Sequence, residues 1–236
     1  ESGETALLTD MEMPLSRLLA QMETTGIAAD TRVLDDLSAE LGADVDAARQ
    51  GAWSAAGREV NLSSPKQLQE ILFDHFALPK TKKTKTGYTT NADALADLWA
   101  KTEASGGAGH DFLGFLLTHR DRIKLKQMVD SLSATVASDG RIHSTFSQVA
   151  AATGRLASSD PNLQNIPARS ADGMRIRGAF VPGVGFESLM SADYSQIEMR
   201  LMAHLSGDEA LIEAFNSGED LHRTMASMVF GTPVAE

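Results

Sequence analysis

Apolar residues recur at helical spacing through the first 137 residues of the chain. In the first such segment they lie on one helix face and precede Gly26, a suitable stop: Met11, Leu15, Leu18, Leu19 and Met22. Asp30 is placed to cap a second helix. Ser64 and Pro65 begin a third in the usual way, with serine as the cap and proline in the first turn. We therefore expect a mainly helical first half.

The pattern predicts two more helices, over residues 91–101 and 111–137. Between the third helix and these two, residues 80–90 lack apolar periodicity and contain several lysines, which indicates an exposed basic loop.

The pattern changes after residue 138. The stretch RIHSTFSQV alternates as a strand does, and RIRGAFVP and ESLMSADY also predict short strands. A long segment with glycine, serine and proline, residues 153–169, lies between them, and three short helical patterns follow Ser195. The expected architecture is an all-helical part, about 1–137, and an α/β part, about 138–236.

Composition is that of an ordinary globular protein, with 42% hydrophobic and 22% charged residues among 236. No apolar run approaches the roughly 20 residues of a membrane helix, and the first residues do not resemble a signal peptide. The absence of cysteine excludes disulfides and thiolate metal sites and is compatible with a reducing cytoplasm. We therefore expect a cytoplasmic protein with no membrane partner.

The net charge of −11 is unevenly distributed. Residues 1–50 carry 3 basic and 11 acidic side chains, and residues 187–220 carry 1 and 8. Three segments between them are basic: residues 58–90, 119–130 and 154–178 carry net charges of +3, +2 and +2. A phosphate backbone responds to local basic surface, so these segments are candidates for nucleic-acid contact. The alternative for each is a solvated face.

Asp193 ends an apolar run and precedes a helical pattern with Ile197, Leu201 and Leu205 on one face. A carboxylate at the end of a buried strand is where α/β folds place ligands, and it is a hard-oxygen ligand suited to Mg²⁺. The alternative is that Asp193 only accepts hydrogen bonds from the backbone of the turn.

Glu198 also has two interpretations. Ser195 and Glu198 have the spacing of a capping box, in which the glutamate reaches back to the cap residue. The second interpretation depends on the sequence motif that contains both residues.

The segment DYSQIEMR (residues 193–200) resembles the first conserved motif of family A DNA polymerases, the bacterial DNA polymerase I group, at nearly every position. TGRLASSDPNLQNIPAR (residues 153–169) resembles a second, more specific segment of that family. Weaker similarity, including LSSPKQL, KTKTGYTT and DGRIHSTFSQ, covers the rest of the chain in the family's order.

The resemblance implies an α+β fold in which a helical thumb is followed by an incomplete α/β palm. Residues 1–137 would form the thumb region, with the first helix packing on the palm. Residues 138–206 would form the first part of the palm, and residues 207–236 the start of the fingers.

The implied activity is template-directed DNA polymerisation in replication and repair. In the family, the Asp193 position and the Tyr194 carbonyl hold two catalytic Mg²⁺ ions for nucleotidyl transfer to a primer 3′-hydroxyl. The Glu198 position excludes ribonucleotides by occupying the place of a 2′-hydroxyl. Arg169, Gln196 and His222 would lie toward the incoming deoxynucleoside triphosphate.

Residues 153–169 would read the minor groove. Correct base pairs present similar acceptors there, so donors can test pairing geometry without reading sequence. The implied readers are Arg155, which also contacts the nucleotide's sugar, and Asn162, Gln164 and Asn165. Without the resemblance, the alternative for the amides is hydrogen bonding within turns.

The basic segments of the thumb would contact the phosphates of a primer–template duplex, which position rather than specify. One group heads the third helix: Asn61, Ser63, Ser64 and Lys66. The others are the predicted thumb tip, Lys82, Lys83 and Lys85, and a row on the last thumb helix, Arg120, Lys124 and Lys126.

The family's second metal aspartate and its nucleotide-binding fingers helix are not in the sequence. We therefore expect a fragment of a monomeric enzyme that does not polymerise DNA alone. The alternatives are a non-catalytic duplex-binding module, a single-subunit RNA polymerase, which Glu198 disfavours, and a metal-dependent hydrolase.

Overall fold

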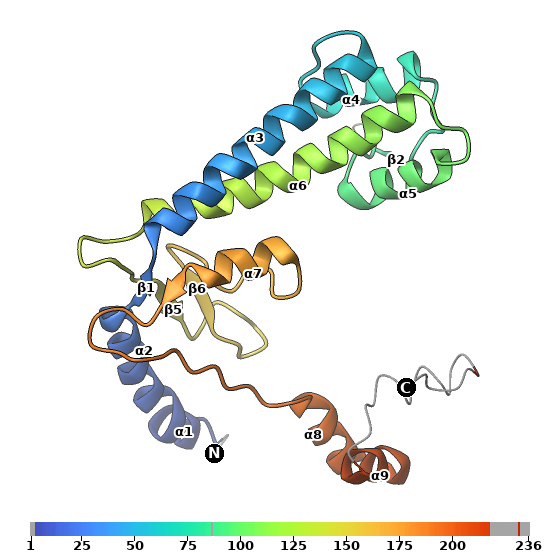
Figure 1. Ribbon diagram of the computed structural model, residues 1–236. Coiled ribbons are helices and arrows are strands. Elements are labelled where there is room, and N and C mark those ends of the chain that lie inside the picture. The colour runs from blue at the N-terminus through green and yellow to red at the C-terminus, as the bar shows by residue number, and fades with distance from the viewer. Residues whose placement is uncertain (1–2, 86, 218–230, 232–236) are drawn as a thin grey trace. The chain divides into compact units, whose positions relative to one another are not determined.

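The computed structural model describes residues 3–85, 87–217 and 231 (Figure 1). The chain divides into two compact units, Glu1–Leu189 and Met190–Glu236.

The first unit contains most of the elements. Its helices are α1 (Glu4–Leu7), the π-helical η1 (Leu8–Glu12), α2 (Met13–Thr25), α3 (Thr31–Ala56), α4 (Pro65–Gln69), the π-helical η2 (Glu70–His75), α5 (Ala92–Thr102), α6 (Ala108–Ala134) and α7 (Ala171–Gly178). Its strands are β1 (Ile27–Ala29), β2 (Lys83–Thr84), β3 (Gly87–Tyr88), β4 (Arg141–Ile142), β5 (Thr145–Ser147), β6 (Ala157–Ser159) and β7 (Phe180–Val181). The second unit contains α8 (Ile197–Ser206) and α9 (Glu209–Ser217). The α+β class predicted from the sequence is confirmed.

Local signals set the helix boundaries as predicted. Gly26 ends α2 with a φ of 61°, in a position where an added Cβ would lie 2.8 Å from the Ile142 carbonyl oxygen. The Asp30 side chain accepts a hydrogen bond from the Arg32 amide at the start of α3. The Ser64 hydroxyl accepts one from the Gln67 amide at the start of α4. Each cap satisfies a helix-end donor that has no partner within the helix.

The long helices α3 and α6 lie side by side in antiparallel directions (Figure 1). Their pairing has two hydrophobic clusters, one toward each end. One cluster joins the end of α3 to the start of α6, and its fully buried members include Ala52, Leu68, Leu72, Leu95, Phe112 and Leu116. The other joins the start of α3 to the end of α6, and it includes Leu34, Leu41, Val129, Leu132, Ile142 and Ile176. The helix pair therefore connects α4, α5 and the β2–β3 hairpin at one end to β1, β4, β7 and α7 at the other.

A small antiparallel sheet has the order β4-β1-β7. Ile27 pairs with Ile142, and Ala28 pairs with Val181. Its central strand, β1, is the short connection between α2 and α3. Residues 27–29, from the part expected to be all-helical, thus pair with two strands from the part beyond residue 138.

Several predicted elements differ in the structure. The segment 80–90 is not a simple loop, since β2 and β3 pair as a short hairpin. Of RIRGAFVP, the first half belongs to helix α7 and only Phe180–Val181 is a strand.

The predicted strand at residues 187–194 is wrong. No described residue pairs with this segment as a strand, and Leu189 and Met190 are 52% and 89% exposed. A strand is held by hydrogen bonds to a neighbour, so an apolar run without a partner strand does not form one. The following helices α8 and α9 agree with the first two helical patterns, and the third pattern lies outside the described residues.

Two histidines respond to their surroundings in opposite directions. His119 on α6 is 6% exposed, and its Nδ1 has no hydrogen-bond partner within the described part of the chain. Burial, followed by the charge of Arg49, lowers the pKa of His119 below its ordinary value. The His143 Nδ1 donates to the Glu23 carbonyl at 2.7 Å, and its Nε2 lies 3.0 Å from a carboxylate oxygen of Asp139. These partners, Glu23 first, raise the pKa of His143.

We predict that His119 makes the fold sensitive to acid. Below pH about 6.5 the unfolded chain takes up a proton that the folded chain resists, so the contribution of neutral His119 is lost as the pH falls. Urea unfolding of the His119→Leu variant, followed by far-UV circular dichroism, should show a smaller loss of stability on acidification than the wild type.

His143→Gln serves as a control of opposite sign. The raised pKa of His143 stabilises the fold at low pH, and this contribution is lost as the pH rises through the folded-state pKa. Its removal should steepen the loss on acidification. Identical pH dependence in wild type and His119→Leu would contradict the assignment.

Candidate nucleic-acid and nucleotide site

Residues 153–169 form a loop built on the β5–β6 hairpin. Phe146 on β5 pairs with Ser158 on β6. The buried Ser144 hydroxyl reaches the carbonyl oxygens of Pro161 at 2.7 Å and Ser159 at 3.1 Å, where the chain leaves β6. The hairpin therefore fixes the point from which the loop continues.

The side chains of Asn162 and Gln164 hold the loop in shape. The Asn162 Oδ1 accepts hydrogen bonds from the Gln164 amide at 2.9 Å and the Ser158 hydroxyl at 3.2 Å. Gln164 spans β6: its Oε1 accepts from the Ser158 amide at 3.2 Å, and its Nε2 donates to the Leu156 carbonyl at 3.0 Å. Both amides thus make hydrogen bonds within turns, which is the alternative to reading DNA. Reading of DNA by these two amides stays a prediction.

The other predicted residues of this loop are exposed at its surface. Arg155 precedes β6, Asn165 lies in the turn after Gln164, and Arg169 lies just before α7. Ser144 and Ser158 are not among the residues predicted from the sequence, although both are buried and bonded to this loop. Serine is common in turns, and only the tertiary contacts distinguish these two.

In the second unit, Asp193 and Tyr194 are exposed in an irregular segment rather than at the end of a buried strand. The strand prediction fails because no described strand pairs with residues 187–194. Within residues 3–85, 87–217 and 231, no three histidine, aspartate or glutamate side chains form a group that could hold a metal ion. The described residues thus supply one carboxylate of the implied pair, which does not by itself make a two-ion site.

The helix after this segment begins differently from the prediction. The N-cap of α8 is Gln196, in a left-handed conformation with φ 53° and ψ 41°, and its side chain makes no capping hydrogen bond. Ser195 therefore lies before the cap, so the predicted Ser195–Glu198 capping box is wrong. The Ser195 carbonyl instead accepts a hydrogen bond from the Arg200 Nε at 3.0 Å. His222, the remaining nucleotide-binding prediction, lies outside the described residues.

Arg200 also joins the two helices of this unit. Its guanidinium carbon lies 4.4 Å from the centre of the Phe215 ring on α9. This contact and the buried Ala203 and Ala214 pack α8 against α9.

At the far end of the helix pair, the predicted thumb-tip lysines are exposed. Lys83 lies on β2, with Lys82 before it and Lys85 after it. The hairpin is anchored where the Lys80 ammonium lies 5.1 Å from the centre of the Tyr88 ring. The arrangement presents three cations to solvent on one short hairpin.

The residues at the start of α4 are partly used for capping. Asn61 Oδ1 accepts a hydrogen bond from the Ser63 amide at 2.9 Å, and the Ser64 hydroxyl caps α4. Lys66, in the first turn, is exposed. The helix start is therefore shaped by its own polar residues, and its cation remains at the surface.

Two of the three cations in the predicted basic row on α6 bond to other parts of the protein. The Arg120 guanidinium donates to the Thr90 carbonyl, and burial lowers its pKa. The Lys126 ammonium lies 2.7 Å from Asp130 and 3.2 Å from the Ser38 hydroxyl of α3. Only Lys124 of the three is exposed. Spacing along a helix does not show which neighbouring element a long side chain will bond.

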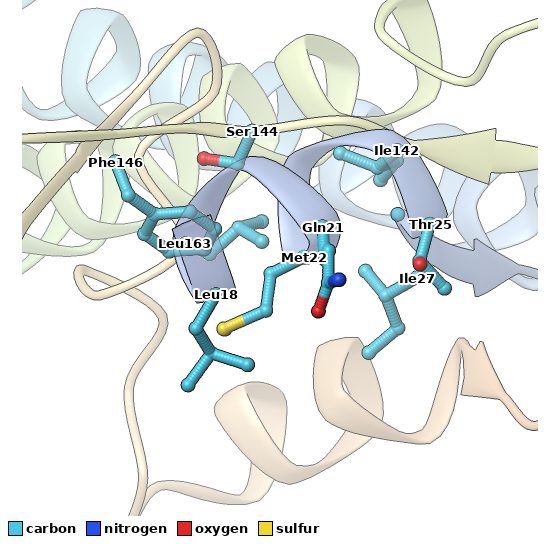
Figure 2. A pocket seen from close by; sticks show the side chains of 10 residues that line it. Leu18, Gln21, Met22, Thr25, Ile27, Ile142, Ser144, Phe146 and Leu163 are labelled. Atoms are coloured by element: carbon cyan, nitrogen blue, oxygen red, sulfur yellow. The ribbon is translucent and has the colours of Figure 1, made fainter. Parts of the chain in front are cut away.

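A hollow with a volume of about 440 Å³ lies beside the β5–β6 hairpin (Figure 2). Its lining is mainly apolar and comes from α2, β1, β4, β5 and the loop: Leu18, Gln21, Met22, Thr25, Gly26, Ile27, Ile142, Ser144, Phe146 and Leu163. No chemical group in this lining resembles a catalytic centre, so the hollow is not the candidate site.

Comparison with known proteins identifies the class of protein. The family model for DNA polymerase family A matches residues 31–236. The chain therefore belongs to DNA polymerase family A.

Individual relatives are similar along almost the whole chain. DNA polymerase I of Mycobacterium tuberculosis is 58% identical over 98% of this chain, and that of Pseudomonas aeruginosa is 46% identical over 98%. The chain spans 25% of the length of each relative.

A solved structure agrees in fold. It is the POL domain of Pol1 from M. smegmatis in complex with DNA primer-template and dNTP. The TM-score is 0.90 at 58% identity, over 97% of this chain and 39% of that one.

Proposed function

We propose that this chain is part of a template-directed DNA polymerase of the DNA polymerase I type. The observation that carries the proposal is its family membership, together with the similarity to a POL domain bound to DNA primer-template and dNTP. Because the chain spans about a quarter of its curated relatives, the activity is proposed for a longer protein to which residues 1–236 contribute.

Duplex DNA would lie along the basic surface. The exposed lysines of the hairpin would contact phosphates, together with Lys66 and Lys124. Such contacts bind a duplex without regard to its sequence. Asn61, Ser63 and Ser64 would shape the start of α4 for the same purpose. Because Arg120 and Lys126 are bonded within the protein, their contact with DNA would require them to exchange partners.

The primer terminus would lie against the loop of residues 153–169. Arg155 and Asn165 are exposed donors, and the internal bonds of Asn162 and Gln164 keep the loop in one conformation. A donor array tests base-pair geometry only if it does not adapt to a mispair. The turn hydrogen bonds therefore support minor-groove reading instead of excluding it.

On the nucleotide side, Asp193 and the Tyr194 carbonyl would be the ligands that this chain contributes to Mg²⁺. The ions, when bound, would supply the positive charge that activates the primer hydroxyl and stabilises the leaving pyrophosphate. A single carboxylate does not complete that site, so catalysis by residues 1–236 alone is not proposed. Arg169, Gln196 and His222 would face the triphosphate.

Glu198 would act as a gate against ribonucleotides. It lies in the first turn of α8 and is exposed. A glutamate near the sugar excludes a 2′-hydroxyl by steric clash and by the cost of leaving polar groups unpaired.

A second candidate, duplex binding without catalysis, is favoured for residues 1–236 by themselves. The described residues contain the exposed cations but no metal-binding group of three side chains.

We predict that Asp193→Ala in the longer polymerase lowers nucleotide incorporation by roughly a thousandfold or more, because a lost ligand removes several kcal/mol of metal stabilisation. Primer–template affinity, measured by fluorescence anisotropy, should stay near that of wild type. Glu187→Ala, which removes an exposed acid from the same segment, is the control and should incorporate normally. Normal turnover by Asp193→Ala would exclude the metal role.

We also predict that Glu198→Ala relaxes sugar selection. The ratio of deoxyribonucleotide to ribonucleotide incorporation, taken as kcat/KM for each, should fall by about tenfold or more. Glu209→Ala, which removes an acid from the first turn of α9, should leave the ratio unchanged. If both variants retain wild-type selectivity, Glu198 is not the gate.

For residues 1–236, we predict duplex binding that weakens with salt. Each phosphate contact releases counterions and contributes about 0.9 to the slope of log K against log salt. Replacing Lys82, Lys83 and Lys85 together with alanine should reduce the slope by roughly 2–3. Lys101→Ala, in the last turn of α5, is the control. A salt-independent affinity would contradict a phosphate-binding surface.

A further inference from the structure

Helix α7 lies between the loop of residues 153–169 and the α3–α6 pair. It follows Arg169 directly, and its cap is Ser170, whose hydroxyl accepts a hydrogen bond from the Gly173 amide at 3.1 Å. The buried Ile176 anchors it in the same cluster as Leu34 and Val129. Polar side chains of α7 bond to the loop and to the two long helices.

One face of α7 holds the loop. The Arg177 Nε donates to the Pro167 carbonyl at 3.2 Å, and its Nη2 donates to the Ile166 carbonyl at 3.2 Å. One guanidinium thus binds two consecutive carbonyls, directly after Asn165. The planar fork of arginine suits such a pair, and lysine offers only a point charge.

Gly173 brings the helix against the same place. An added Cβ would lie 2.3 Å from the Pro167 carbonyl oxygen and 2.7 Å from the Pro167 Cβ. Gly173 and Arg177 are four residues apart, so they lie on one helix face. Two independent contacts therefore press α7 onto Pro167.

The other contacts of α7 join it to the long helices. Arg175 binds Glu40 of α3 through two bonds of 2.8 and 2.6 Å, and Asp172 accepts a bond of 2.7 Å from Arg122 of α6. The hydrogen bond from Arg175 lowers the pKa of Glu40. Exposed ion pairs each add little stability, but the two hydrogen bonds between the Arg175 guanidinium and the Glu40 carboxylate fix the orientation of both groups. The position of α7 is thereby set by both α3 and α6.

We propose that Arg177 is a positioning residue for the primer-terminus loop. With Gly173 it fixes Ile166 and Pro167 to α7, and the ion pairs on α7 fix the loop's position relative to the α3–α6 pair. The inference rests on the proposed function, because the loop is assigned there to the primer terminus. Arg177 does not touch the primer itself and acts through residues 162–165.

We expect Arg177 to contribute less to folding than a buried core residue does. Its bond to Pro167 is exposed, so water can replace the guanidinium there, and its bond to Ile166 is partly buried. Loss of Arg177 should therefore loosen the loop while leaving the helical core folded. This separates a positioning role from a general structural one.

The first experiment measures hydrogen exchange in the chain itself and does not depend on polymerase activity. The Leu163 and Gln164 amides are bonded within the loop, to the Ser158 hydroxyl and Asn162 Oδ1. Arg177→Met and Gly173→Ala should each speed their exchange by about tenfold. Arg177→Lys, which keeps the charge but not the fork, should restore part of the protection.

Two variants are matched controls. Gly178→Ala makes the same change on the same helix, where an added Cβ meets nothing within 4 Å. Arg32→Met removes an arginine that is 88% exposed. Both should exchange as wild type does. Unchanged loop exchange in Arg177→Met would overturn the proposal, as would faster exchange spread through α3 and α6 with a lower Tm.

The second experiment uses the longer polymerase and compares extension of matched and mismatched primer ends. Arg177→Met should reduce the preference for the matched end by about tenfold, with primer–template Kd changed by less than about threefold. A loosened loop with full preference would overturn the positioning role. A wild-type polymerase that extends no primer would instead refute the proposed function, while the exchange experiment would still report on the contact between Arg177 and the loop.

Discussion

The antiparallel pairing of α3 with α6 is the constraint on which the first unit depends. The two helices are separated by about fifty residues in the sequence. Helices in proteins owe most of their stability to the packing of an apolar face, so burial between the two stabilises both. Their pairing places Leu34 beside Val129 at one end and Ala52 beside Phe112 at the other. Other parts of the unit are attached to these ends: the lysine hairpin to one, and β1, α7 and the polar loop to the other.

This arrangement explains why a loop rich in polar residues can be rigid. Asn162 and Gln164 have little apolar surface to bury, yet each is bonded to the backbone around it. The loop is then held at Pro167 by α7, which is itself held by Glu40 and Arg122 of the long helices. Under the proposed function, a rigid donor array in the same unit as the exposed lysines would let the protein bind any duplex and test the pairing at its end.

Among the described residues, no complete metal site of the kind that the family implies is assembled. Asp193 is exposed in an irregular segment, and no metal-binding group of three side chains occurs among the described residues. Exposed apolar residues flank the DYSQIEMR motif along the chain: Leu189 and Met190 before it and Leu201 after it. A strand and a metal pair both require partners from elsewhere in a fold, so a motif can be intact in sequence while its geometry depends on other residues.

The sequence by itself determined most of the helices, the caps at Asp30 and Ser64, and the family, because these depend on residues within a few positions of one another. Asp30, Ser64 and Gly26 act as predicted, since a cap bonds the next turn and a glycine permits its own φ. Only the tertiary structure decided which cations are free and which polar residues build the loop. Arg120 bonds to Thr90, and Lys126 bonds to Asp130 and Ser38. Arg177 donates a hydrogen bond to the Pro167 carbonyl. Such contacts depend on which elements pack together, and the packing of α3 on α6 sets them.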